Sequence, residues 1–318
     1  MQKLFAIVAF LLIYVPHGYT QTPLPKVSWG MVQRIPEFES VHIGKRCIDV
    51  LLPEEYPAYP AKRYPVLYMN DGQMLFDSSQ TWNHQEWGVD EAMREFYLKN
   101  SRACIVVAVH NAGNRRYEEY FPRKAFDLLS ESGKQKVLNL AGKDSNRAMR
   151  DSRPHSDEYL KFLVKELKPA IDLSFRTRPD KSHTWIAGSS MGGLISLYAL
   201  CEYPETFGAA ACLSTHWPGI FANKDNPVPD AFFRYMNQHL PSPASHRIYM
   251  DCGTASLDSL YPVHHRHAVK ILKDKGYRSY NLKEKIVSGA NHSEVAWKAR
   301  MPEVLDFLLQ ARGRKVKP

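Results

Sequence analysis

The segment that most constrains this chain is a short apolar run that ends at a glycine-rich turn. Residues 183–187 read His-Thr-Trp-Ile-Ala, and Gly-Ser-Ser-Met-Gly follows at 188–192. Residues 194–200, Leu-Ile-Ser-Leu-Tyr-Ala-Leu, read as a helix. A strand that turns this sharply into a helix strains the backbone of the middle serine, and glycine on either side leaves the room it needs. We therefore expect Ser190 to stand exposed at the edge of a sheet.

The rest of the chain alternates strand-like and helix-like segments. Strands are expected at 41–52, 64–69, 103–109, 183–187, 208–213, 247–251 and 280–287. Helices are expected at 89–97, 156–173, 194–200, 230–239, 261–275 and 294–309. The alternating segment 41–52 ends at Pro53 and reads as an antiparallel edge strand. Alternation of this kind predicts the α/β class, with a mostly parallel central sheet and helices on both faces.

The first twenty residues differ from the others. Lys3 is the only charge before the apolar stretch 4–15, and small and polar residues follow. This pattern is typical of a secretory signal peptide at 1–20, with an uncleaved anchor as the alternative. Residues 21–318 are then expected to form a single domain, secreted or periplasmic, without stable membrane association. Within it, the charged and irregular segment 111–155 is interpreted as an insertion that could act as a lid.

Composition argues against nucleic-acid-binding and metal-binding classes of protein. The formal net charge of the 318 residues is +9, but no basic run alternates with aromatic residues, so we do not expect nucleic-acid binding. The five cysteines show no C-x-x-C spacing and most lie in apolar runs, which favours buried free thiols and leaves one disulfide open. Neither a metal site nor a catalytic cysteine is expected. The oligomeric state is not predicted.

A serine hydroxyl in such a turn needs a base and an acid that orients the base. In chains with this turn, the acid and then the histidine follow the serine. His292 lies in the loop 288–294 after the last expected strand, where it could reach Ser190. Asp251 and Asp258 are the candidates for the acid, and Asp258 is favoured because it lies beyond the strand, in the loop. Both alternatives remain open at this stage.

The oxyanion that forms during acyl transfer needs two backbone N–H donors. Met191, the residue after the serine, supplies one at a helix N-terminus. The other is expected from the loop after strand 64–69, where the N–H of Gln73 is the candidate. The neighbouring Asn70, Asp71 and Gly72 are expected to contact substrate.

These features occur together in one known family. The motifs in order are residues 68–73 with Phe76, His110-Asn111 with Arg116, Glu119 and Tyr120, the turn 188–193, Asp251-Cys-Gly-Thr254, and 289–294 with Trp297. Together they resemble the α/β-hydrolase family of esterases that includes esterase D, enterochelin (ferric-siderophore) esterases, feruloyl and acetylxylan esterases, and mycolyltransferases. The resemblance implies the α/β-hydrolase fold and catalytic roles for Ser190 and His292. Many members carry the acid where this chain has Ser256, whereas others carry it at the position of Asp258.

The expected activity is hydrolysis of a carboxylic ester through an acyl-enzyme at Ser190, without a cofactor. A siderophore ester and a carbohydrate or feruloyl ester are the candidate substrates. Arg115, Arg116 and Tyr120 are placed at the substrate entrance, where a cationic rim would suit an anionic or catecholate ligand. The alternative is that these arginines pair with Glu118 and Glu119. An acyltransferase and a non-catalytic binding protein with the same fold are the competing functions.

Overall fold

The structure, a computed structural model, describes residues 23–141, 149–220 and 225–309. Its centre is an eight-stranded sheet of order β1-β2-β4-β3-β5-β6-β7-β8. The strands are β1 Met31–Phe38, β2 Arg46–Leu52, β3 Val66–Asn70, β4 Ile105–Val109, β5 Thr184–Ser189, β6 Ala209–Leu213, β7 Arg247–Cys252 and β8 Leu282–Ile286. The signal peptide expected at 1–20 lies outside the described residues.

The sheet is mostly parallel. β3, β4, β5, β6, β7 and β8 run in one direction, while β2 pairs antiparallel with both β1 and β4. The carboxyl ends of the parallel strands therefore share one edge, and the loops that follow them meet there. The predicted α/β architecture is confirmed.

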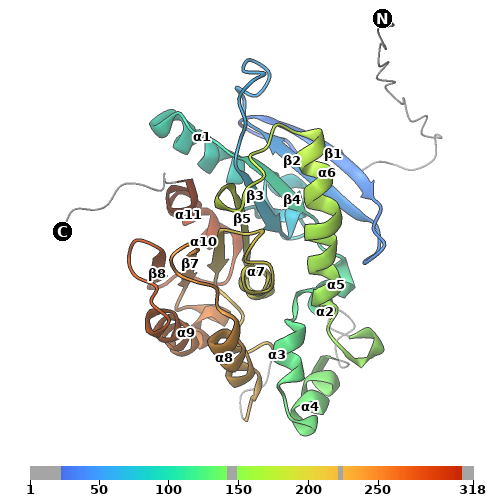
Figure 1. Cartoon of the computed structure of the whole chain (residues 1–318), viewed down its shortest axis with the longest axis vertical. Coiled ribbons are helices and arrows are strands. Elements are labelled where there is room, and N and C mark those ends of the chain that lie inside the picture. Colours follow the sequence, from blue (N-terminus) through green and yellow to red (C-terminus); the bar gives the residue numbers. More distant parts are fainter. Residues whose placement is uncertain (1–22, 142–148, 221–224, 310–318) are drawn as a thin grey trace, which may run out of the picture.

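Helices cover both faces of this sheet (Figure 1). They are α1 Val89–Asn100, α2 Arg116–Tyr120, α3 Arg123–Asp127, α4 Glu131–Ala141, α5 Ser156–Lys161, α6 Lys168–Ser174, α7 Met191–Glu202, α8 Val228–His239, α9 Pro262–Asp274, α10 Glu294–Lys298 and α11 Met301–Leu309. Leu67 and Met69 of β3 pack into the core beneath α1 and α11, while Val66 and Tyr68 pack into the core shared with α5, α7 and α8. No helix in the described part of the chain has both the length and the apolar character that spanning a bilayer requires.

The structure differs from the predicted elements in four places. β1 was not expected, because its eight residues alternate only between exposed and half-buried positions. It is the edge strand, so β2 lies inside the sheet and the edge position expected for 41–52 was wrong. The predicted helix 294–309 is interrupted between α10 and α11, just before Pro302, whose missing N–H cannot extend a preceding helix. The irregular segment expected at 111–155 contains α2, α3 and α4, and α3 lies against α8.

Candidate active site

Ser190 lies between β5 and α7 in a strained backbone conformation, with φ 56° and ψ −122°. Such a positive φ costs a serine about 1–3 kcal/mol, which the surrounding packing must offset. A Cβ on Gly188 would stand 2.6 Å from the carbonyl oxygen of Gly192, so glycine at position 188 allows the turn to close. Met191 is the first residue of α7, and its N–H has no acceptor within the helix.

Asn70, the last residue of β3, makes hydrogen bonds to the strand and the helix that flank this turn. Its side-chain amide donates to Ser196 Oγ at 3.0 Å and to the Ala187 carbonyl at 3.3 Å. Its oxygen accepts from the Tyr159 hydroxyl at 2.6 Å. Because Asn70 is only 2% exposed and its amide groups are engaged, we assign it a positioning role rather than the substrate contact expected from the sequence.

His292 and Asp258 come together from two loops at the carboxyl edge. His292 Nδ1 lies 2.6 Å from Asp258 Oδ1. The histidine ring is held edge-on by Trp297 at 5.0 Å and by Tyr261 at 5.7 Å between ring centroids. A histidine fixed in this way has one ring nitrogen committed to the carboxylate and the other left for a reacting group.

The Asp258 carboxylate is fully buried and surrounded by donors. Besides His292, it accepts hydrogen bonds from Ser214 Oγ at 2.5 Å and from the Gly253 N–H at 2.6 Å. Burial alone would raise the pKa of Asp258, but the hydrogen bonds from His292 and Ser214 outweigh it and hold the pKa below its usual value. Asp258 is therefore ionised at neutral pH.

Asp251, the other candidate acid, has different partners. Its carboxylate lies 3.0 Å from Arg300 Nε and accepts from the Tyr249 hydroxyl at 2.9 Å. Burial raises the pKa of Asp251 to about 6, against the opposing charge of Arg300. Of the two acids that the sequence left open, the structure places Asp258 against His292.

The loop that was expected to carry the second oxyanion donor follows β3. Asp71 has φ 59°, and a short helical turn at Gly72–Met74 comes next. A Cβ on Gly72 would lie 2.5 Å from the Ala108 backbone, so glycine is needed for this loop to sit on β4. Close packing thus accounts for glycine at position 72, and the substrate contact expected of Gly72 stays a prediction. The Gln73 side-chain oxygen accepts from the Asn111 N–H at 3.1 Å, which fixes the loop that carries the Gln73 amide.

Asp71 and Arg116 form a bidentate ion pair beside the turn. Arg116 Nε and Nη2 lie 2.6 Å and 2.7 Å from the two Asp71 oxygens. One of these oxygens would be 3.2 Å from a Cβ on Gly192, which places the pair next to Ser190. Arg116 is 28% exposed and stacks over the Tyr120 ring at 5.1 Å. Of the residues expected to contact substrate, Arg116 is the most exposed to solvent.

The cationic rim expected from the arginines is largely neutralised. Arg116 pairs with Asp71, and Arg115 Nε lies 2.8 Å from Glu118. Tyr120 is fully buried, and its hydroxyl accepts from the Asp71 N–H at 3.3 Å. Tyr120 therefore does not line the entrance as expected; it supports Asp71 from inside the protein.

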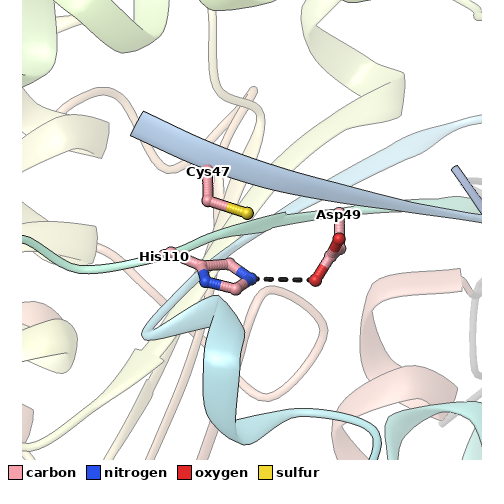
Figure 2. Close-up of side chains that lie close together, drawn as sticks. All are labelled: Cys47, Asp49 and His110. Atoms are coloured by element: carbon pink, nitrogen blue, oxygen red, sulfur yellow. Dashed lines mark hydrogen bonds and ion pairs between the residues drawn. The ribbon is translucent and has the colours of Figure 1, made fainter. Parts of the chain in front are cut away.

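A metal ion could be considered at one cluster in the described part of the chain. Figure 2 shows Cys47 and Asp49 of β2 and His110 after β4 pointing toward one another, and their ligand atoms lie within 4.8 Å of each other. Arg34 Nε and Nη2, however, bind both oxygens of Asp49, at 2.6 Å and 2.7 Å. Burial raises the pKa of the Cys47 thiol to about 11. The charge of Asp49 is already balanced by a guanidinium, so we interpret the cluster as an ion-pair network between β1, β2 and β4. The five cysteines are free thiols.

Comparisons with known proteins identify the family of this chain. Residues 43–308 match the model of a family described as "Putative esterase". This chain belongs to that family. It is a carboxylic ester hydrolase, as the motifs in its sequence predicted.

Individual relatives are distant. The endo-1,4-beta-xylanase/feruloyl esterase of Xylanibacter ruminicola is 26% identical over 89% of this chain and 32% of its own length, so the chain spans about a third of that relative. The structure of a ferulic acid esterase superposes with a TM-score of 0.63 at 17% identity, covering 88% of this chain and 98% of the other. The structure of the enterobactin esterase FES of Shigella flexneri, crystallised in the presence of enterobactin, superposes with a TM-score of 0.61 at 16% identity, covering 90% of this chain and 59% of the other. At these identities the two structures establish the α/β-hydrolase fold of this esterase.

Three side chains around His292 were not assigned a role from the sequence. Ser214 follows β6 directly, and its position at the carboxyl edge of a parallel strand was a usable signal. Trp297 belongs to a quoted family motif, but the motif did not show that its ring holds His292. Tyr261 carried no signal in the sequence, because only the fold brings its ring against that of His292.

Proposed function

We propose that this esterase uses Ser190 as nucleophile, His292 as general base and acid, and Asp258 as the residue that orients His292. The hydrogen bond between His292 Nδ1 and Asp258 carries the proposal, because it leaves the other imidazole nitrogen for the serine. The strained turn at Ser190 is the second support. The N–H groups of Met191 and Gln73 are proposed to hold the oxyanion.

The reaction then has two stages. Ser190 Oγ attacks the ester carbonyl carbon while His292 takes the serine proton. The bond to the alcohol oxygen breaks, His292 returns the proton to that oxygen, and the acyl group stays on Ser190. A water molecule then attacks the acyl carbon and gives its proton to His292. The bond to Ser190 Oγ breaks, the serine recovers its proton, and the carboxylic acid is released.

An ester of an aromatic acid such as ferulate is the substrate class we favour. The ferulic acid esterase structure matches nearly the whole of both chains, whereas the enterobactin esterase is matched over 59% of its length. The two arginines expected to attract an anionic siderophore are paired with Asp71 and Glu118. A ferric catecholate trilactone is the second candidate.

Hydrolysis of methyl ferulate, acetyl and butyryl p-nitrophenyl esters and a ferric catecholate trilactone tests these assignments. Ser190→Ala is expected to lower kcat by at least about 10⁴-fold, and Asp258→Asn by about 10²–10⁴-fold. The matched control is Asp251→Asn, a nearby buried acid bound to Arg300, which should retain activity within about tenfold. Equal losses in the two aspartate variants would contradict the assignment of Asp258.

The same acyl-enzyme could pass its acyl group to an alcohol in place of water. Product analysis with an added sugar or polyol separates an acyltransferase from a hydrolase, because only the former yields a new ester. A protein that binds these esters but turns none of them over would be a non-catalytic relative.

We further propose that the mature protein, residues 21–318, is secreted or periplasmic. The support is the pattern of residues 1–20, with one charge before an apolar stretch. Expression of the full chain in a secreting bacterial host, followed by N-terminal sequencing of the exported protein, should give a start at Gln21. A protein that stays in the membrane fraction with residues 1–20 attached would contradict cleavage.

A further inference from the structure

The carboxylate of Asp71 balances the charge of Arg116. Arg116 donates from Nε and Nη2 to the two carboxylate oxygens, and Asn111 Nδ2 donates to one of them at 2.7 Å. Asp71 is only 6% exposed, while the Arg116 side chain is 28% exposed. Three hydrogen bonds therefore fix the carboxylate against the guanidinium, and the arginine is the member of the pair that reaches solvent.

This pair lies beside the turn that carries Ser190. A Cβ on Gly192, two residues after Ser190, would be 3.2 Å from Asp71 Oδ2. Asp71 also directly precedes the helical turn Gly72–Met74, which contains the proposed oxyanion donor Gln73. A charge at this position acts on an ester held at Ser190 through a partly desolvated medium, where electrostatic interactions are stronger than in water.

The loop that carries His292 adds an acidic group and exposed apolar side chains. Glu294, two residues after His292, accepts a hydrogen bond from Asn83 Nδ2 at 2.8 Å. Trp82 and Val295, the neighbours of this pair along the chain, are 83% and 61% exposed. An anionic group that displaces water from apolar side chains loses its hydration without gaining a partner. This surface therefore favours an uncharged substituent.

We propose that Asp71 determines the charge selectivity of this esterase: by neutralising Arg116 it makes uncharged esters better substrates than esters that carry an anionic group near the reacting carbonyl. The inference rests on the proposed role of Ser190 as nucleophile. A free guanidinium would bind a carboxylate through its planar fork of N–H donors. Here Asp71 already occupies that fork, so an anionic substituent meets no net positive charge.

The inference separates the two candidate substrate classes. A feruloyl ester is uncharged around its ester bond, whereas a ferric catecholate carries a net negative charge, because three catecholates outweigh one ferric ion. Asp71→Asn keeps the shape of the side chain and removes its charge, so it should improve the relative rate on anionic esters. A purely structural role of Asp71 would instead lower the rates on charged and uncharged esters by the same factor.

A matched pair of substrates tests this selectivity: p-nitrophenyl hexanoate, and the p-nitrophenyl monoester of adipic acid, in which a carboxylate replaces the terminal methyl group. The wild type should prefer the hexanoate. In Asp71→Asn the ratio of kcat/KM for the adipate to that for the hexanoate should rise by about tenfold or more, and added salt should reduce the rise. The matched control is Asp127→Asn, which removes the same charge from the exposed Arg123–Asp127 pair of α3 and should leave the ratio within about twofold.

Arg116→Gln gives a second, independent variant. It leaves the Asp71 carboxylate without its guanidinium, so the ratio should fall below that of the wild type. Because Asp71 acts through Arg116, the double variant should lose the gain seen in Asp71→Asn.

The inference is overturned if the wild type prefers the adipate, if either single variant leaves the ratio within about twofold of the wild type, or if the gain persists in the double variant. Ser190→Ala separates the two levels of the account. An active Ser190→Ala overturns the proposed nucleophile, while an inactive one together with an unchanged ratio in Asp71→Asn overturns this inference alone.

Discussion

The hydroxyl of Ser214 donates a 2.5 Å hydrogen bond to Asp258. The backbone N–H of the same serine donates to an oxygen of Asp251 at 3.2 Å. One residue at the end of β6 therefore serves two buried carboxylates. The pKa values of the two acids are shifted in opposite directions. Burial raises the pKa of Asp251, whereas the hydrogen bonds from His292 and Ser214 outweigh burial and lower the pKa of Asp258.

Asp251 should make the protein less stable as the pH rises from about 4 to 6. Its folded pKa of about 6 lies above the unfolded value of about 3.9, so its stabilising contribution is complete below pH 4 and is lost as the pH rises through 6. The full effect is about 3 kcal/mol at most, since one pKa unit corresponds to about 1.4 kcal/mol.

Thermal unfolding of wild type and Asp251→Asn between pH 4 and pH 7 measures this contribution as a difference, in which the other titrating groups cancel. The difference in unfolding free energy should shift in favour of the variant as the pH rises. Parallel curves for the two proteins would show that the pKa of Asp251 is not raised.

Replacing Asn70 should destabilise the protein and slow it. Asn70→Ala removes the buried hydrogen bonds to the Tyr159 hydroxyl and to the Ala187 carbonyl, which typically costs about 2–4 kcal/mol in total. Urea unfolding would measure that loss, and kcat should fall because the turn at Ser190 loses its support. Asn100→Ala, at the half-buried end of α1, should cost less than about 1 kcal/mol and leave kcat unchanged. Equal effects of the two changes would argue against a special role for Asn70.

Gly72→Ala should displace the oxyanion loop. The new Cβ would lie 2.5 Å from the Ala108 backbone, so the loop must move, at about 1–3 kcal/mol for an overpacked site. We expect kcat to fall with little loss of fold, because the Gln73 amide moves with the loop. Gly44→Ala is the control, since the nearest atom to its Cβ would be Arg115 Nη1 at 3.8 Å. An unchanged kcat in Gly72→Ala would remove Gln73 from the proposed oxyanion site.

The cluster around Asp49 should behave as an ion-pair network. Removing its guanidinium with Arg34→Met leaves a carboxylate that is 2% exposed beside His110 and the Cys47 thiol, and about 3 kcal/mol of stability should be lost. Zn²⁺ should not raise the melting temperature of the wild type, because Arg34 already occupies both Asp49 oxygens. A Zn²⁺-dependent rise that disappears in Cys47→Ala would show instead that the cluster holds a metal.

The sequence alone predicts those features of the fold whose signals lie in consecutive residues. The turn at Ser190 was readable because glycine, strand and helix are consecutive. The choice between Asp251 and Asp258 was not, because it depends on which carboxylate the loop at His292 reaches in space. β1 could not be predicted from hydrophobic periodicity, because none of its residues is fully buried. It is held in the sheet by antiparallel pairing with β2. The break before Pro302 was readable in principle, because proline lacks the N–H that a continuous helix needs.

The candidate site likewise contains residues that the sequence could predict and residues that it could not. Sequence placed Ser190, His292 and the oxyanion loop by rules of order along the chain. It could not place Tyr261, whose ring contact with His292 joins the residue before α9 to the loop before α10. It also suggested a cationic entrance, which the pairing of Arg116 with Asp71 neutralises.

The most direct test of the account is detection of the acyl-enzyme. Wild-type protein would be mixed with an acetyl p-nitrophenyl ester, quenched in acid within milliseconds to seconds, digested and examined by mass spectrometry. We predict an acetyl group on the peptide that contains Ser190 and none in Ser190→Ala, which should also lose turnover. Sustained turnover by Ser190→Ala, or an acetyl group carried by another residue, would contradict the proposed mechanism.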